Sequence, residues 1–289
     1  MGTKPLVTVI CSTYNNPHFL EMVLLSLKEQ TFKDFEVIIA DDGSKPETKK
    51  LIEKYQLEFP FLLIHAWHED KGFRKSKIHN QAIEMSCGDL LVFIDGDCIC
   101  RKDFLKDHVS IYKKNKKREK GYVFMGRRVE LGKKYTQRLS PTKSNQSLLG
   151  AFPFKLWLSC LQGDSRSFLR TYSIKNKVLR KVLKADHVND LLGCNFSLPK
   201  ETLLSINGFN EDLDGGNDSI GEDGDIFIRL KNLGVLRIGK KYFAPMFHLY
   251  HERKDRAESY QKYLEKLKQT KYVWAHNGFK KDQRNENRP

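Results

Sequence analysis

The sequence predicts an α/β protein built on a mostly parallel β-sheet with helices on both faces. In its first hundred residues, short apolar runs alternate with segments whose apolar residues recur at helical spacing. The runs are apolar at nearly every position, which is typical of strands covered on both sides in a parallel sheet. With 289 residues, 39% of them hydrophobic, the chain can bury the core that such a sheet needs.

Four strands and three helices are expected in this part of the chain. The strands are LVTVIC at 6–11, FEVIIA at 35–40, FLLIHA at 61–66 and LLVFI at 90–94. The helices run over 17–30, 46–55 and 76–86. No GxGxxG follows the first strand and no GxxxxGK[ST] occurs, so neither a dinucleotide-binding fold nor a P-loop is supported.

Polar side chains follow three of these strands at the point where each strand ends. Ser12 and Tyr14 follow the first, Asp42 the second, and Asp95 and Asp97 the fourth. Ligands of parallel sheets bind at the carboxyl ends of the strands, so these side chains are expected to share one rim. The Asp-x-Asp spacing puts two carboxylates on one side of an extended chain, where they repel unless a cation or proton lies between them. Mn²⁺ and Mg²⁺ prefer oxygen ligands and bridge phosphates, so the rim is expected to hold a metal-bound diphosphate.

Two simpler interpretations apply to parts of this rim. Asp41 is expected to cap the turn that follows the second strand. An Asp-rich rim also occurs in receiver-type phosphoacceptor domains. Those domains are much shorter than this chain and leave its second half unexplained.

Several motifs together resemble family 2 glycosyltransferases with the GT-A fold. VTVICSTYNN, QTFKDFEVIIADDGS and FIDGD look like their nucleotide-binding half. NGFNEDL, GEDGDIFIRLKNLG and FHLYHER resemble the C-terminal part of the β-1,4-galactosyltransferases and polypeptide N-acetylgalactosaminyltransferases. The resemblance covers roughly 5–108 and 190–255. It implies a GT-A (Rossmann-like) fold. The charge and the apolar spacing of this chain add a basic helical insertion and a C-terminal helix to that fold.

The resemblance implies a donor site for a UDP-sugar. The implied donor-binding residues are Ser12, Tyr14, Asp42, Phe73, Arg74, Lys75 and Asp95. Ser12, Tyr14 and Asp42 would hold the uracil and ribose, with Asp42 accepting from the uracil N3–H. Asp95 would face the ribose or a metal-bound water. Arg74 and Lys75 would lie near the diphosphate.

The resemblance also implies a metal site for Mn²⁺ or Mg²⁺. Asp97 would bind the ion directly, and His251 matches a late histidine ligand. His248 falls where some relatives place a methionine ligand. The alternative is a purely structural role, in which FHLYHER is the half-buried end of a strand.

Sugar transfer needs a base for the acceptor hydroxyl, and a carboxylate can serve. Glu222 and Asp223 open a segment with apolar residues at helical spacing. One carboxylate can bind sugar hydroxyls while the other acts as base, and the resemblance assigns the base to Asp223. A single base facing the anomeric carbon implies inversion. The alternative is that both residues are ordinary negative charges favoured at a helix N-terminus.

The charge of the chain is unevenly distributed. The net charge is +15 with a pI near 9.4, and residues 110–190 carry all of the excess, with 20 Lys and Arg against 5 Asp and Glu. This region holds the aromatic segment FPFKLWLSCL at 152–161 and the basic amphipathic segment IKNKVLRKVLK at 174–184. Such segments suit an anionic membrane surface. The apolar stripe could instead be a core helix, or the region a groove for an acidic glycan. No motif supports nucleic-acid binding.

The chain is divided into a nucleotide-sugar-binding half at 1–108, a basic, partly amphipathic insertion at 109–190 and an acceptor half at 191–255. A C-terminal helix and polar tail at 256–289 complete it. No signal peptide is expected, and the six cysteines form no CxxC pair, so they are expected to be buried and reduced. We expect a cytoplasmic protein, peripheral at the inner face of the cell membrane.

The sequence therefore predicts a metal-dependent inverting glycosyltransferase. It would transfer a hexose or N-acetylhexosamine from a UDP-sugar to a polysaccharide or lipid-linked oligosaccharide. A sugar nucleotidyltransferase would use similar Asp–metal chemistry but would leave the late carboxylates and histidines without a role. A catalytically inactive membrane-surface relative is the non-enzymatic alternative, and the intact carboxylates argue against it.

Overall fold

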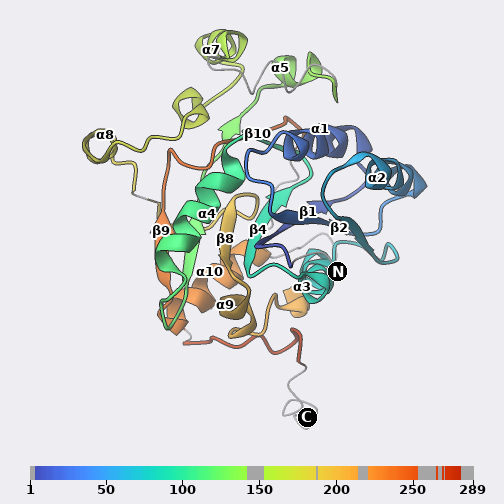
Figure 1. The fold of residues 1–289 in the computed structure, drawn as a ribbon, viewed down its shortest axis with the longest axis vertical. Helices are drawn as coiled ribbons and strands as arrows, with labels where there is room; N and C mark the ends of the chain where they lie inside the picture. The colour runs from blue at the N-terminus through green and yellow to red at the C-terminus, as the bar shows by residue number, and fades with distance from the viewer. Residues whose placement is uncertain are drawn as a thin grey trace.

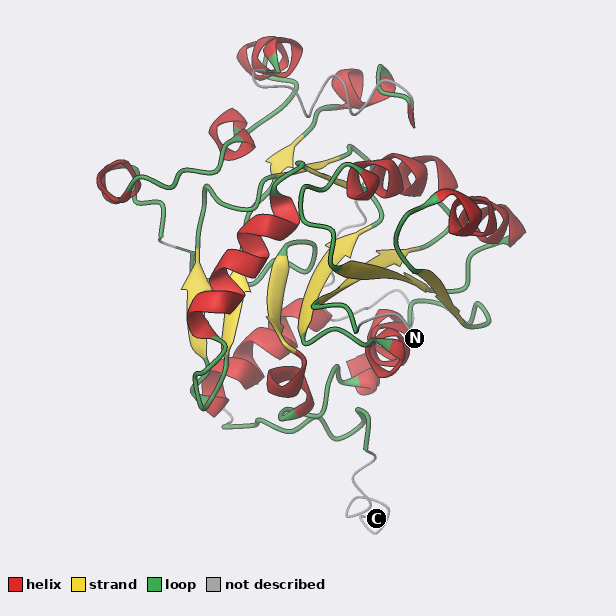
Figure 2. Ribbon diagram, in the orientation of Figure 1, coloured by secondary structure: helices red, strands yellow, loops and turns green. Residues whose placement is uncertain are grey.

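The computed structural model of the chain describes residues 4–141, 153–186, 188–213, 221–252, 265, 269 and 271–280. In these residues, a seven-stranded sheet has the order β3-β2-β1-β4-β8-β6-β9, and a three-stranded sheet has the order β5-β10-β7 (Figures 1 and 2). The strands are β1 Val7–Thr13, β2 Phe35–Asp41, β3 Leu63–Trp67, β4 Leu90–Asp95, β5 Cys98–Cys100, β6 Tyr122–Met125, β7 Val129–Glu130, β8 Phe196–Pro199, β9 Leu236–Gly239 and β10 Met246–His248.

The helices cover both faces of the large sheet (Figure 2). The helices of the described residues are α1 Pro17–Lys28, α2 Pro46–Glu58, α3 Lys75–Met85, α4 Phe104–Asn115, α5 Lys133–Gln137, α7 Phe154–Leu161, α8 Lys177–Val182, α9 Lys200–Leu204 and α10 Glu222–Leu233, with 3-10 turns η1 Phe168–Thr171 and η2 Glu211–Leu213. The predicted fold class, a mostly parallel sheet flanked by helices, is confirmed. In the large sheet only the pairings of β8 with β4 and with β6 are antiparallel.

The alternation of side chains along the strands explains why both faces are covered. In β1, Val7 and Val9 belong to one apolar core and Ile10 to the other. In β4, Val92 belongs to the same core as Val7 and Val9, and Phe93 belongs to the same core as Ile10. Successive side chains of a strand point to opposite faces, so an all-apolar strand requires a helix layer on each side. α1, α2 and α4 supply one layer, and α3, α9 and α10 supply the other.

The second half of the chain departs from the simple alternation seen in the first. The boundary placed at 108/109 falls inside α4, and β6 from the expected insertion lies in the large sheet between β8 and β9. The helix expected around 256–274 and the polar tail lie mostly outside the described residues. α7 and α8 lie at the periphery, apart from the main layers (Figure 1). No helix in the described ranges is long and apolar enough to cross a bilayer.

A buried histidine in the core should make the protein sensitive to acid. His108 of α4 is fully buried between the rings of Phe104 and Phe124, and its Nδ1 lies 2.8 Å from Ser197 Oγ. Burial lowers the pKa of His108 to about 3 from its ordinary value of 6.5. The unfolded chain therefore binds one more proton than the folded chain between these two values.

We expect the contribution of His108 to the free energy of unfolding to be fully present above pH 6.5 and to fall as the pH drops toward 3. One pKa unit corresponds to about 1.4 kcal/mol, so the loss should reach a few kcal/mol. Urea unfolding at pH 7, 5.5 and 4 measures it. His108→Gln should flatten the acid limb, whereas His18→Gln, at an exposed site, should leave it unchanged. If the free energy of unfolding falls equally steeply with pH in His108→Gln and in wild type, His108 is not the group responsible for the acid sensitivity.

Candidate active site

The end of β4 is tied to the end of β1. Ser12 lies opposite Asp95 in the β1–β4 register, and its Oγ donates to Asp95 Oδ1 at 2.7 Å. The Gly96 amide donates to the Ser12 carbonyl at 2.7 Å. A Cβ at Gly96 would approach this carbonyl to 3.0 Å, so the tight turn favours glycine. The expected rim of polar side chains is therefore present at the carboxyl ends of these strands.

One lysine joins the two halves of the predicted site. Lys75, the first residue of α3, places Nζ 3.0 Å from Asp95 Oδ1 and 2.9 Å from Glu222 Oε1 at the start of α10. Burial alone would lower the pKa of Lys75, but the two carboxylates outweigh it and raise the pKa well above its usual value. The ammonium ion therefore holds the carboxylates of Asp95, at the end of β4, and Glu222, at the start of α10, at one point.

Removing this ammonium ion should destabilise the fold. Lys75→Met keeps much of the side-chain volume but leaves Asp95 and Glu222 close together without a cation. Deleting one partner of a buried ion pair costs about 3 kcal/mol or more, so we expect a loss of that size in the free energy of unfolding. Chemical denaturation measures it. Lys77→Met, at an exposed position of the same helix, is the matched control and should change stability by less than about 0.5 kcal/mol.

Asp42 is held rigidly at the end of β2. Its Oδ1 lies 2.7 Å from His68 Nε2, and its Oδ2 accepts from the Arg74 amide at 3.0 Å. Burial raises the pKa of Asp42, and the hydrogen bonds from Arg74 and His68 oppose that rise. His68 was not among the residues predicted for the site.

The outer edge of the predicted donor site is more open. The Tyr14 side chain is half-exposed, and its hydroxyl donates to Asp70 Oδ2 at 2.9 Å. Phe73 is exposed, and the Arg74 guanidinium donates to the Glu69 carbonyl. Neither Tyr14 nor Arg74 has a side-chain contact to Asp95 among the described interactions.

Asp97 lies between two histidines from the far end of the chain. Its Oδ2 is 3.2 Å from His251 Nε2 and 3.5 Å from His248 Nε2. Antiparallel pairing of β10 with β5, which sets His248 opposite Cys98, brings these residues together. Asp97, His248 and His251 offer ligand atoms within 4.8 Å of one another, so they could hold a divalent cation.

A second carboxylate orients one of these histidines. Glu130 Oε2 lies 3.1 Å from His248 Nδ1, and Arg128 Nε donates to Glu130 Oε1 at 2.8 Å. Burial would lower the pKa of His248, but hydrogen bonds to Asp97 and Glu130 raise it to about 9. Burial would likewise raise the pKa of Asp97, yet the two histidines lower it well below its usual range. Glu130 was not among the residues predicted for the site. It could have been noticed in the sequence as one of the few acidic residues of the basic segment at 110–190.

Glu222 and Asp223 open α10, as predicted. Asp223 Oδ2 accepts from the Gly193 amide at 3.3 Å, and Oδ1 accepts from the Gly224 amide at 2.8 Å. The helix is anchored by the fully buried Arg229, whose guanidinium pairs with Asp225 one turn earlier. Arg229 also donates to the carbonyls of Ile206 and Gly208, at 2.7 and 2.8 Å. This anchor fixes where the two carboxylates project.

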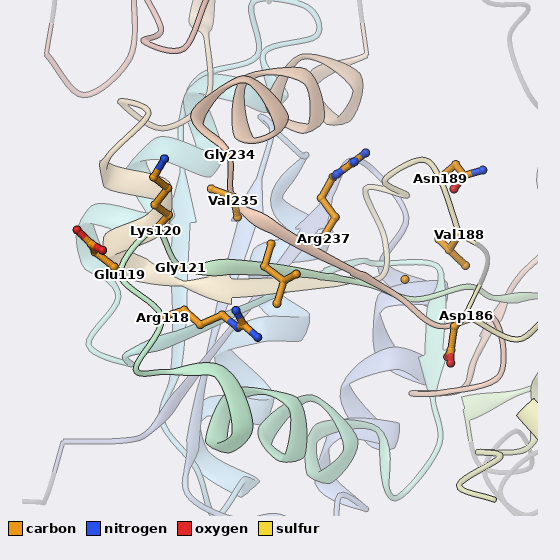
Figure 3. A pocket seen from close by; sticks show the side chains of 12 residues that line it. Arg118, Glu119, Lys120, Gly121, Asp186, Val188, Asn189, Gly234, Val235 and Arg237 are labelled. Carbon is orange, nitrogen blue, oxygen red and sulfur yellow. The ribbon is translucent and has the colours of Figure 1, made fainter. Parts of the chain in front are cut away.

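A separate hollow of about 690 Å³ lies along β9, which is an edge strand of the large sheet (Figure 3). Arg118, Lys120 and Arg237 line it together with Glu119 and Asp186. It contains none of the predicted site residues. The carboxylate and histidine groups, not this hollow, are therefore the candidate active site.

Comparison with known proteins decides the family. The sequence profile named Glycosyl transferase family 2 matches residues 8–200, well over half of the chain. The chain belongs to glycosyl transferase family 2. The profile ends before α10 and β10, so it does not cover the segments that resemble the galactosyltransferases.

Individual relatives of this family 2 chain match about a third of its length. An uncharacterized glycosyltransferase of Bacillus subtilis, YfnE, is 35% identical over 106 residues, which are 36% of this chain and 26% of that protein. TarS of Staphylococcus aureus, a poly(ribitol-phosphate) β-N-acetylglucosaminyltransferase, is 31% identical over 102 residues, 35% of this chain and 18% of TarS. The chain thus spans about a quarter of the first relative's length.

Solved structures show that the fold is that of the GT-A glycosyltransferases. TarS residues 1–349 in complex with UDP-GlcNAc superpose with a TM-score of 0.57 at 17% identity, covering 90% of this chain and 65% of that one. The mannosyltransferase PcManGT of Pyrobaculum calidifontis, in complex with GDP-Man and Mn²⁺, gives 0.55 at 17% identity, covering 87% and 59%.

Proposed function

We propose that this family 2 chain is a metal-dependent inverting glycosyltransferase. It transfers a hexose or N-acetylhexosamine from a UDP-sugar to a glycan acceptor, either a polysaccharide or a lipid-linked oligosaccharide. The observation that carries the proposal is the Lys75 bridge between Asp95 and Glu222, beside the Asp97–histidine group. It joins the side chains that nucleotide-sugar binding and acceptor activation would each need.

Asp97, His248 and His251 would hold the metal ion, which the chemistry of this donor set supports. A bound divalent cation would stabilise the negative charge that develops on the leaving diphosphate. Imidazole nitrogens suit Mn²⁺ better than Mg²⁺, which prefers oxygen ligands. Glu130 accepts from His248 Nδ1–H, so it leaves Nε2 directed at Asp97. We therefore favour Mn²⁺ over Mg²⁺.

Asp42 supports a nucleotide base as the ligand at the end of β2. His68 and the Arg74 amide already fix the Asp42 carboxylate. An oxygen lone pair of Asp42 can therefore accept a further hydrogen bond from a ligand without the side chain losing more conformational entropy. A uracil N3–H would donate to it. Ser12 and Asp95, linked by their hydrogen bond, would lie near the ribose.

Asp223 is the proposed base. The Gly193 and Gly224 amides each donate to one of its oxygens and hold the carboxylate in a fixed orientation. Glu222 is engaged by Lys75, so it suits binding of sugar hydroxyls better than proton transfer. The roles of Asp223 and His251 also rest on the resemblance to the galactosyltransferases. One base acting opposite the leaving group gives inversion at the anomeric carbon.

Release of UDP from UDP-sugars in the presence of Mn²⁺, without acceptor, tests the proposal. We expect slow release of UDP from at least one member of a panel of UDP-hexoses and UDP-N-acetylhexosamines, and release of GDP from GDP-mannose at less than a tenth of that rate. Pyrophosphate release from UTP with a sugar 1-phosphate, without any UDP release from the panel, would instead indicate a sugar nucleotidyltransferase.

We also propose that the basic segment rests on an anionic membrane at the cytoplasmic face. α7 and α8 expose apolar side chains, with Trp157 and Leu161 on α7 and Val178 and Val182 on α8. No residue of α8 is buried, which argues against the core-helix alternative. Arg180 pairs with Asp186, so it is a poorer candidate for lipid headgroups than the lysines beside it.

Lys177→Glu with Lys181→Glu should weaken sedimentation with anionic vesicles more than tenfold at low salt. Each basic residue near an anionic surface contributes about 1 kcal/mol, and the substitution both removes and reverses charge. Lys49→Glu with Lys50→Glu on α2 makes the same charge change at another exposed site and should have little effect. A wild-type protein that ignores anionic vesicles at low salt would contradict the membrane role and favour a groove for an acidic glycan.

A further inference from the structure

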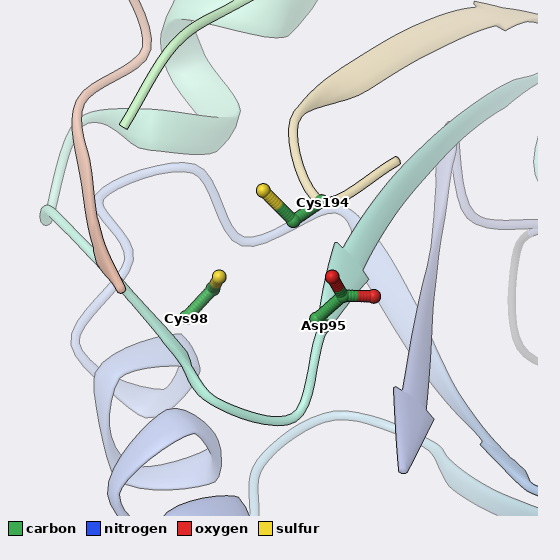
Figure 4. A group of neighbouring side chains, drawn as sticks. All are labelled: Asp95, Cys98 and Cys194. Atoms are coloured by element: carbon green, nitrogen blue, oxygen red, sulfur yellow. The ribbon is translucent and has the colours of Figure 1, made fainter. Parts of the chain in front are cut away.

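Two cysteines far apart in sequence meet beside the proposed donor site. Cys98 begins β5, and Cys194 lies in the loop just before β8. Both thiols are free and buried, whereas Cys87 is exposed and Cys160 half-buried. With Asp95 they form a group whose sulfur and oxygen atoms lie within 4.8 Å of one another (Figure 4).

The fold brings these three side chains together by one strand pairing and one turn. β8 pairs antiparallel with β4, which carries the loop of Cys194 to the end of the strand bearing Asp95. The turn at Gly96 then returns the chain into β5, so Cys98 comes back toward the same point (Figure 4). The group is therefore set by the sheet itself.

The charges around the group differ between its two thiols. Arg128 Nη1 donates to Cys194 Sγ at 3.2 Å, and a neighbouring cation favours the thiolate form that binds metals. The Cys98 thiol instead donates to Asp97 Oδ1 at 3.2 Å, so the ion has to displace its proton. Two thiolates and Asp95 would carry three negative charges against two on a divalent cation. Arg128 and Lys75 lie close enough to offset the remainder.

The donor atoms differ in kind from those of the Asp97–histidine group. Two sulfurs and one carboxylate oxygen select thiophilic ions over Mn²⁺ or Mg²⁺. In a tetrahedral Zn²⁺ site with bonds of about 2.3 Å, two sulfurs lie about 3.8 Å apart. The two sulfur atoms of the group lie within 4.8 Å of each other, so a small movement at most brings them to the separation of such a site. Three protein ligands leave the fourth position for water.

We propose that Cys98, Cys194 and Asp95 form a binding site for a thiophilic divalent cation of the Zn²⁺ class, distinct from the Asp97–His248–His251 group. On binding, each thiol releases its proton to solvent and its sulfur bonds the ion, so no oxidant or reductant is involved. Ser12 and Lys75 both contact the Asp95 carboxylate through Oδ1, so a bound ion competes with them for this carboxylate. The ion therefore opposes nucleotide binding, a consequence that rests on the proposed function.

Cd²⁺ is the probe for the site, because Cd–thiolate bonds absorb in the near ultraviolet whereas Cd–imidazole and Cd–carboxylate bonds do not. We expect one equivalent of Cd²⁺ to give this absorption with the full chain. Cys98→Ser and Cys194→Ser should each reduce the signal at least twofold and weaken Cd²⁺ binding at least tenfold. Cys87→Ser removes a thiol outside the group and should change neither. Asp95→Asn keeps both thiols, so it should retain the absorption with weaker affinity.

The outcomes separate this site from the proposed function. No Cd–thiolate absorption in wild type, or equal absorption in Cys194→Ser, overturns the site whatever the enzyme does. Asp95→Asn provides the same test if a serine variant does not fold, because unchanged Cd²⁺ affinity there also overturns the three-ligand site. UDP affinity measured with and without Cd²⁺ should fall at least tenfold in wild type and less than twofold in Cys194→Ser. If Cd²⁺ lowers UDP affinity equally in wild type and in Cys194→Ser, an ion at this site does not oppose nucleotide binding.

Discussion

Asp97→Ala is expected to abolish the Mn²⁺-dependent part of UDP binding. Asp97 is the carboxylate that faces both His248 and His251, so its loss leaves the two imidazoles without an anionic ligand between them. We expect the affinity for UDP with Mn²⁺ to fall more than a hundredfold, to the level measured with a chelator present. Isothermal titration calorimetry with UDP, with and without Mn²⁺, measures the difference.

The control for Asp97→Ala is Asp89→Ala, because Asp89 forms an exposed ion pair with Lys4 away from the rim. It should bind UDP as the wild type does. Unchanged affinity of Asp97→Ala for UDP in the presence of Mn²⁺ would remove Asp97 from the metal site.

Asp223→Asn is expected to bind donor normally and to lose transfer. The amide keeps the shape of the side chain but cannot take the acceptor proton, so turnover should fall by about 100- to 10,000-fold. UDP affinity should stay within about threefold of wild type, because an amide of the same shape can keep the positions that the Gly193 and Gly224 amides hold. Initial rates of transfer at saturating donor, together with calorimetry, separate the two effects.

Asp212→Asn makes the same chemical change at an exposed position and should retain full turnover. If Asp223→Asn keeps most of its turnover, the base is another group, and Glu222→Gln is the next variant to measure.

The first half of the fold could be predicted because its strands are long and apolar. β1, β2 and β4 run within two residues of the expected strands, and α1 and α2 begin at the predicted prolines. β6, β8 and β9 are only four residues each, and a run that short carries too little periodicity to be distinguished from a loop. Their places in the sheet depend on tertiary pairing.

The candidate site likewise contains residues that could be predicted from the sequence and residues that could not. Ser12, Asp42, Asp95 and Asp97 follow predicted strands, so a shared rim could be inferred from topology alone. His251 reaches Asp97 only because β10 pairs with β5, and the resemblance to known families supplied that link. Residues that act through others, such as Glu130 behind His248 and His68 behind Asp42, carry no motif of their own.

A crystal structure of the chain with UDP and Mn²⁺ tests the central claim most directly. The account predicts an anomalous Mn²⁺ peak bonded to Asp97 and at least one of His248 and His251, with uracil against Asp42. An ion and nucleotide bound elsewhere, for instance in the hollow beside β9, with these side chains unchanged, would contradict it.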